Sequence, residues 1–201
     1  MSFHPLMVYD KRFQQSERKL LEEGEPFTFT AARRAELDEL LTKYPPDQKR
    51  SAVLAALYLV QDQQGYLTAS AIRHVAGILE RTPAEVEDVA TYYVMFHKER
   101  VGKYVLQVCR TLSCALNGAE KVTAELCKHL HVKPNETTAD GLFTVMEFEC
   151  LGACDRAPVI MVNNEHWHEC QQPGDVPALI EGLRTRGLAA LSGCHLVKER
   201  A

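Results

Sequence analysis

The chain has 201 residues, of which 46 % are hydrophobic and 25 % are charged, and its formal net charge is −4. This balance is ordinary for a globular protein of one or two domains, and without an excess of basic residues we expect no nucleic-acid partner. The longest apolar run covers only residues 52–60, against the roughly 20 residues that a membrane-spanning helix needs, so we expect no direct membrane insertion.

The first 28 residues form a predicted N-terminal extension. They lack the apolar core of a secretory signal, and they carry acidic side chains that a mitochondrial transit peptide would avoid. We therefore expect a cytoplasmic protein, in a reducing compartment where stable disulfides are rare. Seven cysteines also fit poorly with a paired disulfide framework, so we set that role aside.

Residues 29–100 read as a helical region. Apolar residues recur at helical spacing in four segments: 30–43, 47–63, 68–80 and 82–96. Thr30 is the predicted cap of the first segment, and Gly65 follows the end of the second. The fourth begins with TPAE, in which Thr82 and Glu85 have the spacing of a capping box. Short connections between four helices predict a small helical bundle.

From residue 101 onward the pattern changes to that of an α/β domain. Predicted strands at 103–109 and 142–150 flank a helix at 113–130, and such a crossover leaves the two strands parallel. A hairpin at 159–169 turns at Asn163-Asn164, and a closing helix covers 173–187.

The predicted class is therefore α/β, with an N-terminal helical bundle followed by a thioredoxin-like domain. The order of elements in that domain is β-α-β-β-β-α, in a mixed sheet that spans residues 101–187. Residues 188–201 are a predicted C-terminal tail. No internal repeat is visible.

Two cysteine loops follow the two parallel strands. The first, CRTLSC, contains Cys109 and Cys114, and the second, CLGAC, contains Cys150 and Cys154. The carboxyl ends of neighbouring parallel strands lie at one edge of a sheet, about 4.8 Å apart. We therefore expect all four sulfurs to meet at that edge.

Three chemistries compete for four converging thiols. A thiol–disulfide oxidoreductase uses C-x-x-C at the start of a helix, and this chain contains no C-x-x-C. A structural zinc ion accepts four cysteines and tolerates these gaps. A 2Fe–2S cluster also takes four thiolates, two for each iron. The spacing leaves zinc and the cluster open, and we favour the cluster because the domain does not need a metal to fold.

The surroundings of the loops suit an anionic group. Cys114 is predicted at a helix N-terminus, where free N–H groups favour anions. Arg110 and Arg156 each lie within two residues of a predicted ligand, so both are candidates for tuning a cluster. The alternative is that these arginines are merely solvated.

Four longer motifs resemble a known family: KRSAVLAALYLVQDQQGYLT, VATYYVMF, GKYVLQVCRTLSC and EFECLGACDRAP. Together, across about residues 44–184, they are similar to the thioredoxin-like 2Fe–2S subunit of respiratory NADH:quinone oxidoreductase (complex I, an NADH dehydrogenase). Relatives of that subunit occur in NAD-linked hydrogenases and formate dehydrogenases. The chain departs from the family pattern at Arg100, in place of a frequent proline, and at 166–168, where HWH replaces the usual tyrosines.

The resemblance implies that Cys109, Cys114, Cys150 and Cys154 ligate one 2Fe–2S cluster. It also implies an electron-transfer subunit that docks onto the flavin- and NADH-binding subunit of its complex, beside other peripheral-arm subunits. FMN and NADH would be held only by that partner, in agreement with the lack of a dinucleotide or Walker motif here. We thus expect a non-catalytic subunit, held at the bacterial cytoplasmic membrane through its complex.

Three cysteines remain outside this set. Cys127 lies on the predicted 113–130 helix as a small buried thiol, and Cys194 lies in the tail. His166, His168 and Cys170 alternate along one strand face, which a metal could use. An edge hairpin without a metal explains this pattern better, because no fourth ligand is evident.

Overall fold

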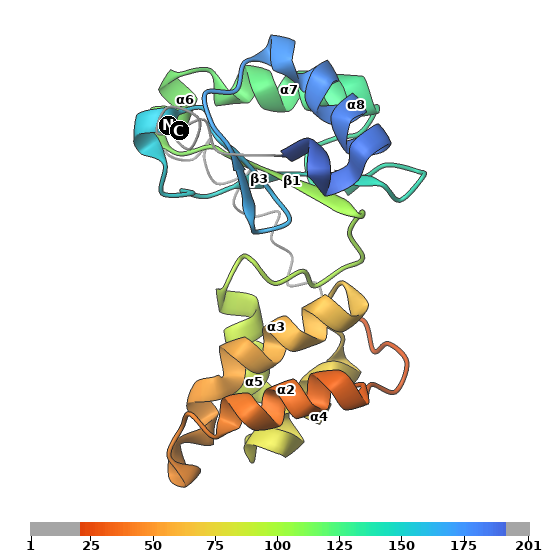
Figure 1. Cartoon of the computed structure of the whole chain (residues 1–201), viewed down its shortest axis with the longest axis vertical. Helices are drawn as coiled ribbons and strands as arrows, with labels where there is room; N and C mark the ends of the chain where they lie inside the picture. The colour runs from red at the N-terminus through yellow and green to blue at the C-terminus, as the bar shows by residue number, and fades with distance from the viewer. Residues whose placement is uncertain (1–20, 192–201) are drawn as a thin grey trace, which may run out of the picture. The chain divides into compact units, whose positions relative to one another are not determined.

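The computed structural model describes residues 21–191, and the chain divides into two compact units between Glu99 and Arg100 (Figure 1). Each unit has its own hydrophobic core. Most of the predicted N-terminal extension and the C-terminal tail, including Cys194, lies outside the described residues. No helix within residues 21–191 is both long enough and apolar enough to cross a bilayer.

The first unit is a bundle of short helices. Its elements are α2 (Ala31–Leu41), the 3-10 segment η1 (Pro46–Ala52), α3 (Val53–Gln64), α4 (Ala69–Leu79) and α5 (Pro83–Tyr92). The helix caps predicted from the sequence are present in the structure. Thr30 caps α2, Gly65 ends α3 with a φ of 89°, and Thr82 and Glu85 form the capping box of α5. The buried side chains of α2, α3, α4 and α5 make the core.

Two helix boundaries differ from the prediction. The segment predicted to be helical from residue 47 is a 3-10 turn until Ala52, because its polar residues provide no apolar stripe before Val53. The helix predicted to reach Phe96 ends at Tyr92. The buried Gln61 side chain accounts for this early end, since it donates to the Met95 carbonyl at 3.0 Å and accepts from the His97 N–H at 2.7 Å.

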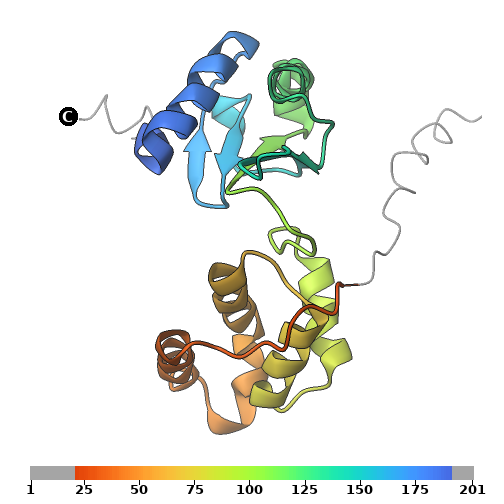
Figure 2. The same ribbon diagram turned by 90° about the vertical axis from the view of Figure 1, so that its right-hand side faces the viewer.

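The second unit is a mixed sheet with helices. Its elements are β1 (Tyr104–Cys109), α6 (Leu112–Leu116), α7 (Ala119–Leu130), β2 (Glu136–Thr137), β3 (Phe143–Phe148), η2 (Cys154–Arg156), β4 (Ile160–Val162), β5 (His166–His168), η3 (Pro173–Asp175), α8 (Val176–Arg186) and η4 (Gly187–Leu191). The strand order is β2-β3-β1-β4-β5, with β1 and β3 parallel and the other pairs antiparallel. Helices α7 and α8 lie side by side on the sheet (Figure 2). The predicted mixed α/β class is confirmed.

The details of this unit correct the prediction at three places. The helix predicted over 113–130 is two helices, because Gly118, with a φ of 93°, breaks the chain between α6 and α7. The short β2 was not predicted. The strand predicted over 142–150 ends at Phe148, which leaves Cys150 in a loop. The hairpin turn is confirmed: Asn163 and Asn164 have φ values of 54° and 60°.

Candidate metal centre

The first cysteine loop joins β1 to α6. Cys109 is the last residue of β1, its side chain is buried, and its N–H donates to the Val159 carbonyl at 3.1 Å. Cys114 is also buried, in the first turn of α6. Thr111, between them, places its hydroxyl 3.2 Å from the Cys109 Sγ. The sheet thus fixes one thiol of this loop directly, and the short helix fixes the other.

The second loop follows β3, and both of its thiols are exposed. The Sγ atoms of Cys150 and Cys154 lie 3.9 Å apart. Between them the backbone turns at Gly152, whose φ of 78° is readily adopted only by glycine. This turn directs the Gly152 N–H toward the Cys150 Sγ, at 3.4 Å. The loop therefore presents a pair of sulfurs, one of which accepts a backbone hydrogen bond.

The register of the sheet brings the two loops together. Cys109 pairs with Phe148 in the parallel β1–β3 ladder, and the Arg110 N–H donates to the Phe148 carbonyl at 3.0 Å. Both loops therefore leave the same sheet edge, as the sequence predicted.

The thiols of the first loop have opposite pKa shifts. Burial opposes ionisation of Cys109, but hydrogen bonds from Thr111, from the Leu151 backbone and from Cys114 outweigh it and lower the pKa. Burial, the hydrogen bond to Cys109 and the nearby charges of Cys109 and Cys154 raise the pKa of Cys114 to about 11. One thiol of the pair is thus stabilised as an anion and the other as a proton donor.

The two thiols of the second loop also have opposite pKa shifts. The Gly152 N–H, with Cys154 and Thr111 as further donors, lowers the pKa of Cys150. The hydrogen bond to Cys150 and the negative charge of that neighbour raise the pKa of Cys154. Hydrogen bonds and charge interactions therefore connect the thiols of the two loops, and four thiolates at this edge would need positive charge to stabilise them.

The donor set fits a 2Fe–2S cluster. Two thiolates held at tetrahedral positions about 2.3 Å from one metal lie about 3.8 Å apart. The Cys150–Cys154 separation of 3.9 Å is close to that value. Within residues 21–191 no group of three or more His, Cys, Asp or Glu side chains is arranged to hold a single metal ion. A 2Fe–2S cluster takes two thiolates at each iron, and the two loops each supply a pair.

Both candidate tuning arginines have acidic neighbours. Arg110 forms a salt bridge of 2.6 Å with Glu149, the residue before Cys150. Arg156, whose side chain is more buried, lies 3.6 Å from an Asp155 oxygen. Each positive charge near the loops is therefore partly compensated, which sequence spacing alone did not reveal.

The remaining predicted candidates lie outside the two cysteine loops. Cys127 packs against the core of the second unit, and burial raises its pKa. The predicted alternation of His166, His168 and Cys170 stops at the end of β5, because Cys170 adopts a positive φ of 53° and its N–H donates to the Arg156 carbonyl. The structure does not bring these three residues together as a group that could hold a metal.

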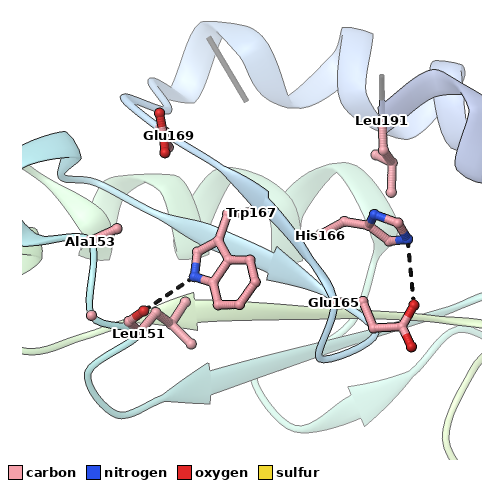
Figure 3. A pocket seen from close by; sticks show the side chains of 8 residues that line it. Leu151, Ala153, Glu165, His166, Trp167, Glu169 and Leu191 are labelled. Carbon is pink, nitrogen blue, oxygen red and sulfur yellow. Dashed lines mark hydrogen bonds and ion pairs between the residues drawn. The ribbon is translucent and has the colours of Figure 1, made fainter. Parts of the chain in front are cut away.

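Sequence reasoning missed the residues that support the second loop. A cavity of about 480 Å³ adjoins it (Figure 3). Its lining consists of Leu151, Gly152, Ala153, Glu165, His166, Trp167, Glu169 and Leu191. Trp167 donates from its indole Nε1 to the Leu151 carbonyl at 3.2 Å. The sole tryptophan of the sequence was a visible signal, but its contact with a loop 16 residues away depends on the hairpin geometry.

The fold and these two loops define a class of protein: a thioredoxin-like domain that carries two cysteine pairs at one sheet edge and contains no C-x-x-C motif. The model of the family described as "Thioredoxin-like [2Fe-2S] ferredoxin" matches residues 37–184. The chain belongs to this family.

Curated relatives carry names of respiratory enzymes. NADH-quinone oxidoreductase subunit 2 of Thermus thermophilus is 44 % identical over 148 residues, which cover 74 % of this chain and 82 % of the relative. An NADH-quinone oxidoreductase subunit from Rickettsia conorii is 44 % identical over 147 residues, covering 73 % of this chain and 88 % of the relative.

A solved structure shares the fold. An NAD+-reducing [NiFe]-hydrogenase in the air-oxidized state superposes with a TM-score of 0.60 at 22 % identity, over 71 % of this chain and 24 % of the hydrogenase chain. This chain thus corresponds to about a quarter of that one. At this identity the likeness concerns the fold alone.

Proposed function

We propose that this chain is an electron-transfer subunit of an NADH:quinone oxidoreductase. Its one 2Fe–2S cluster would be held by Cys109, Cys114, Cys150 and Cys154 and would exchange single electrons with the flavin of the NADH-oxidising partner subunit. The observation that carries this proposal is the meeting of two cysteine pairs at one sheet edge. Membership of the 2Fe–2S family and the 44 % identity to respiratory subunits support it.

When bound, a 2Fe–2S cluster supplies reversible one-electron transfer. The protein's own residues divide the remaining tasks. Cys109 and Cys114 are buried and would shield one side of the centre from water, whereas Cys150 and Cys154 are exposed and would bring the other side to the surface. Thr111 and Gly152 direct hydrogen bonds at the sulfurs, which stabilise negative charge there.

The surface beside the loops suits a protein partner. Leu112 and Leu116, one turn apart on α6, are 75 % and 79 % exposed, and Cys114 lies between them in the sequence. Exposed apolar side chains beside a redox centre would let a flavin-bearing partner approach the sulfurs closely. In this proposal the chain has no active site of its own, and it reaches the bacterial cytoplasmic membrane only through its complex and the other peripheral-arm subunits.

An equivalent subunit of an NAD-linked hydrogenase or formate dehydrogenase is the second candidate. The fold it shares with the hydrogenase favours this alternative, but at 22 % identity the support is weaker than that from the respiratory relatives. A zinc-stabilised interaction module without a redox role is the third.

Anaerobic purification of the native complex tests all three. We expect a reddish-brown preparation with two irons and two acid-labile sulfides per chain. We also expect co-purification with an NADH-oxidising flavoprotein and a quinone-reducing membrane complex. Co-purification with a hydrogenase or a formate dehydrogenase instead would transfer the assignment to those enzymes. A colourless chain with one zinc would overturn the electron-transfer role.

A further inference from the structure

The peptide between Leu151 and Gly152 is hydrogen-bonded at both ends. Its carbonyl oxygen accepts from Trp167 Nε1 at 3.2 Å, and its N–H donates to the Cys150 Sγ at 3.4 Å. Figure 3 shows the indole nitrogen of Trp167 directed at the Leu151 carbonyl. A single rigid peptide plane therefore connects the tryptophan to a predicted ligand sulfur.

The hydrogen bond from Trp167 fixes the orientation of the Leu151–Gly152 peptide. Gly152 has no side chain and can adopt many backbone conformations, so the loop by itself does not hold this peptide plane. Trp167 comes from β5, which the Met161–Trp167 pairing anchors to β4. A hydrogen bond to the carbonyl also polarises the peptide and strengthens its N–H as a donor. The hairpin thus holds the plane in the orientation that serves the sulfur.

We propose that Trp167 is a positioning residue that raises the reduction potential of the metal–sulfur centre through the Leu151–Gly152 peptide. The proposal rests on the cluster described under the proposed function. Reduction adds negative charge to the centre, and hydrogen bonds to its sulfurs stabilise that charge. Loss of the indole N–H weakens the Gly152 donor and makes the centre harder to reduce.

The test uses the full-length chain with its cluster. Trp167→Phe keeps an aromatic ring and removes the N–H. Because the sequence has one tryptophan, growth on a benzothienyl analogue, in which sulfur replaces the indole N–H, changes the same atom alone. We expect both to keep iron and sulfide and to lower the midpoint potential. The reduction equilibrium constant should fall about two- to fivefold, which is about 20 to 40 mV for one electron.

The control variant is Tyr58→Phe, which removes a hydroxyl from an aromatic side chain that packs against the core of the helical unit and carries no part of the second loop. We expect it to leave the potential and the electron-paramagnetic spectrum unchanged. Equal potentials for the wild type, Trp167→Phe and the analogue would overturn the role of Trp167 while leaving the cluster assignment intact. Wild-type protein without a 2Fe–2S spectrum would instead overturn the proposed function, and this inference with it. If Trp167→Phe loses its cluster, the isosteric analogue decides the question.

Discussion

At the residue scale, the four cysteines are not equivalent. Cys109 and Cys150 are the thiols with lowered pKa values, whereas Cys114 and Cys154 act as proton donors to them. A bound cluster requires all four as thiolates, so it must displace a proton even from Cys114, whose pKa is about 11. Assembly of the centre should therefore release protons.

Replacement of one predicted ligand tests this set. We expect Cys154→Ala to empty or destabilise the site, because its iron would lose one of two protein thiolates. Cys127→Ala and Cys170→Ala are the matched controls, since both cysteines lie outside the two loops, and they should keep full iron and acid-labile sulfide. Full occupancy in Cys154→Ala would remove that residue from the ligand set.

The charge beside the second loop provides a further prediction. Arg156→Ala should lower the midpoint potential, because the arginine's positive charge stabilises the reduced state and the variant lacks it. Its side chain is 29 % exposed and Asp155 lies 3.6 Å away, so the effect should be screened to a few tens of millivolts at most. Asp155→Asn is the matched variant and should shift the potential upward. A redox titration in which both variants match the wild type would show that this ion pair does not affect the centre.

At the element scale, local signals in the sequence predicted the helices well and their ends less well. The capping box of α5 depends on residues three apart, and it is present as predicted. The end of α5 is decided by Gln61, more than 30 residues earlier, and no local pattern could indicate that. The break at Gly118 was visible as a glycine, but the 113–130 stripe concealed it.

The same distinction applies to the candidate site. The loop spacing and the parallel crossover were enough to predict that four cysteines share one edge. The peptide that links Trp167 to Cys150 could not be predicted, since it depends on the β4–β5 register and on the positive φ of Gly152. Sequence patterns were enough to predict candidate sulfur ligands, whereas the hydrogen-bond donors around them depend on the tertiary structure.

The segment after α5 carries a pH-dependent element. His97 is buried, its Nδ1 has no hydrogen-bond partner among the described residues, and burial lowers its pKa from 6.5 to about 4. Above pH 6.5 the imidazole is neutral in both the folded and the unfolded chain. Between pH 6.5 and 4 only the unfolded chain takes up the proton, so the free energy of unfolding falls as the pH falls.

The expected loss of stability is on the order of 3 kcal/mol by pH 4, at 1.36 kcal/mol for each pH unit in that window. Urea unfolding followed by circular dichroism from pH 4 to 7.5 measures it. His97→Gln removes the titrating group while keeping a polar side chain, and it should flatten the profile over this range. An equally steep profile in His97→Gln would assign the acid sensitivity to another group.

At the scale of the whole molecule, all predicted cluster ligands belong to the second unit, and the first unit is a helical bundle without any of them. All four predicted ligands lie after the boundary at Glu99 and Arg100, and the second unit has its own core of strands and helices. The helical unit contributes no predicted ligand, yet the family match begins at residue 37. Because the family match includes this unit although it holds no predicted cluster ligand, we expect the unit to serve in docking onto a partner subunit. The exposed Tyr92 and Val94 provide apolar surface for such a contact.

A fragment that begins near Val101 separates these roles. We expect it to assemble the cluster, with the visible and electron-paramagnetic spectra of the full chain, but to lose most of its affinity for the flavoprotein subunit. Tyr92→Ser in the full chain should weaken binding without changing the spectra, because that side chain is 79 % exposed and packs little within its own unit. Binding of the fragment as tight as that of the full chain would show that the thioredoxin-like domain, with Leu112 and Leu116 beside the loops, is sufficient for docking and that the helical unit adds no affinity. A fragment that cannot retain iron would show that the helices are needed to form the centre itself.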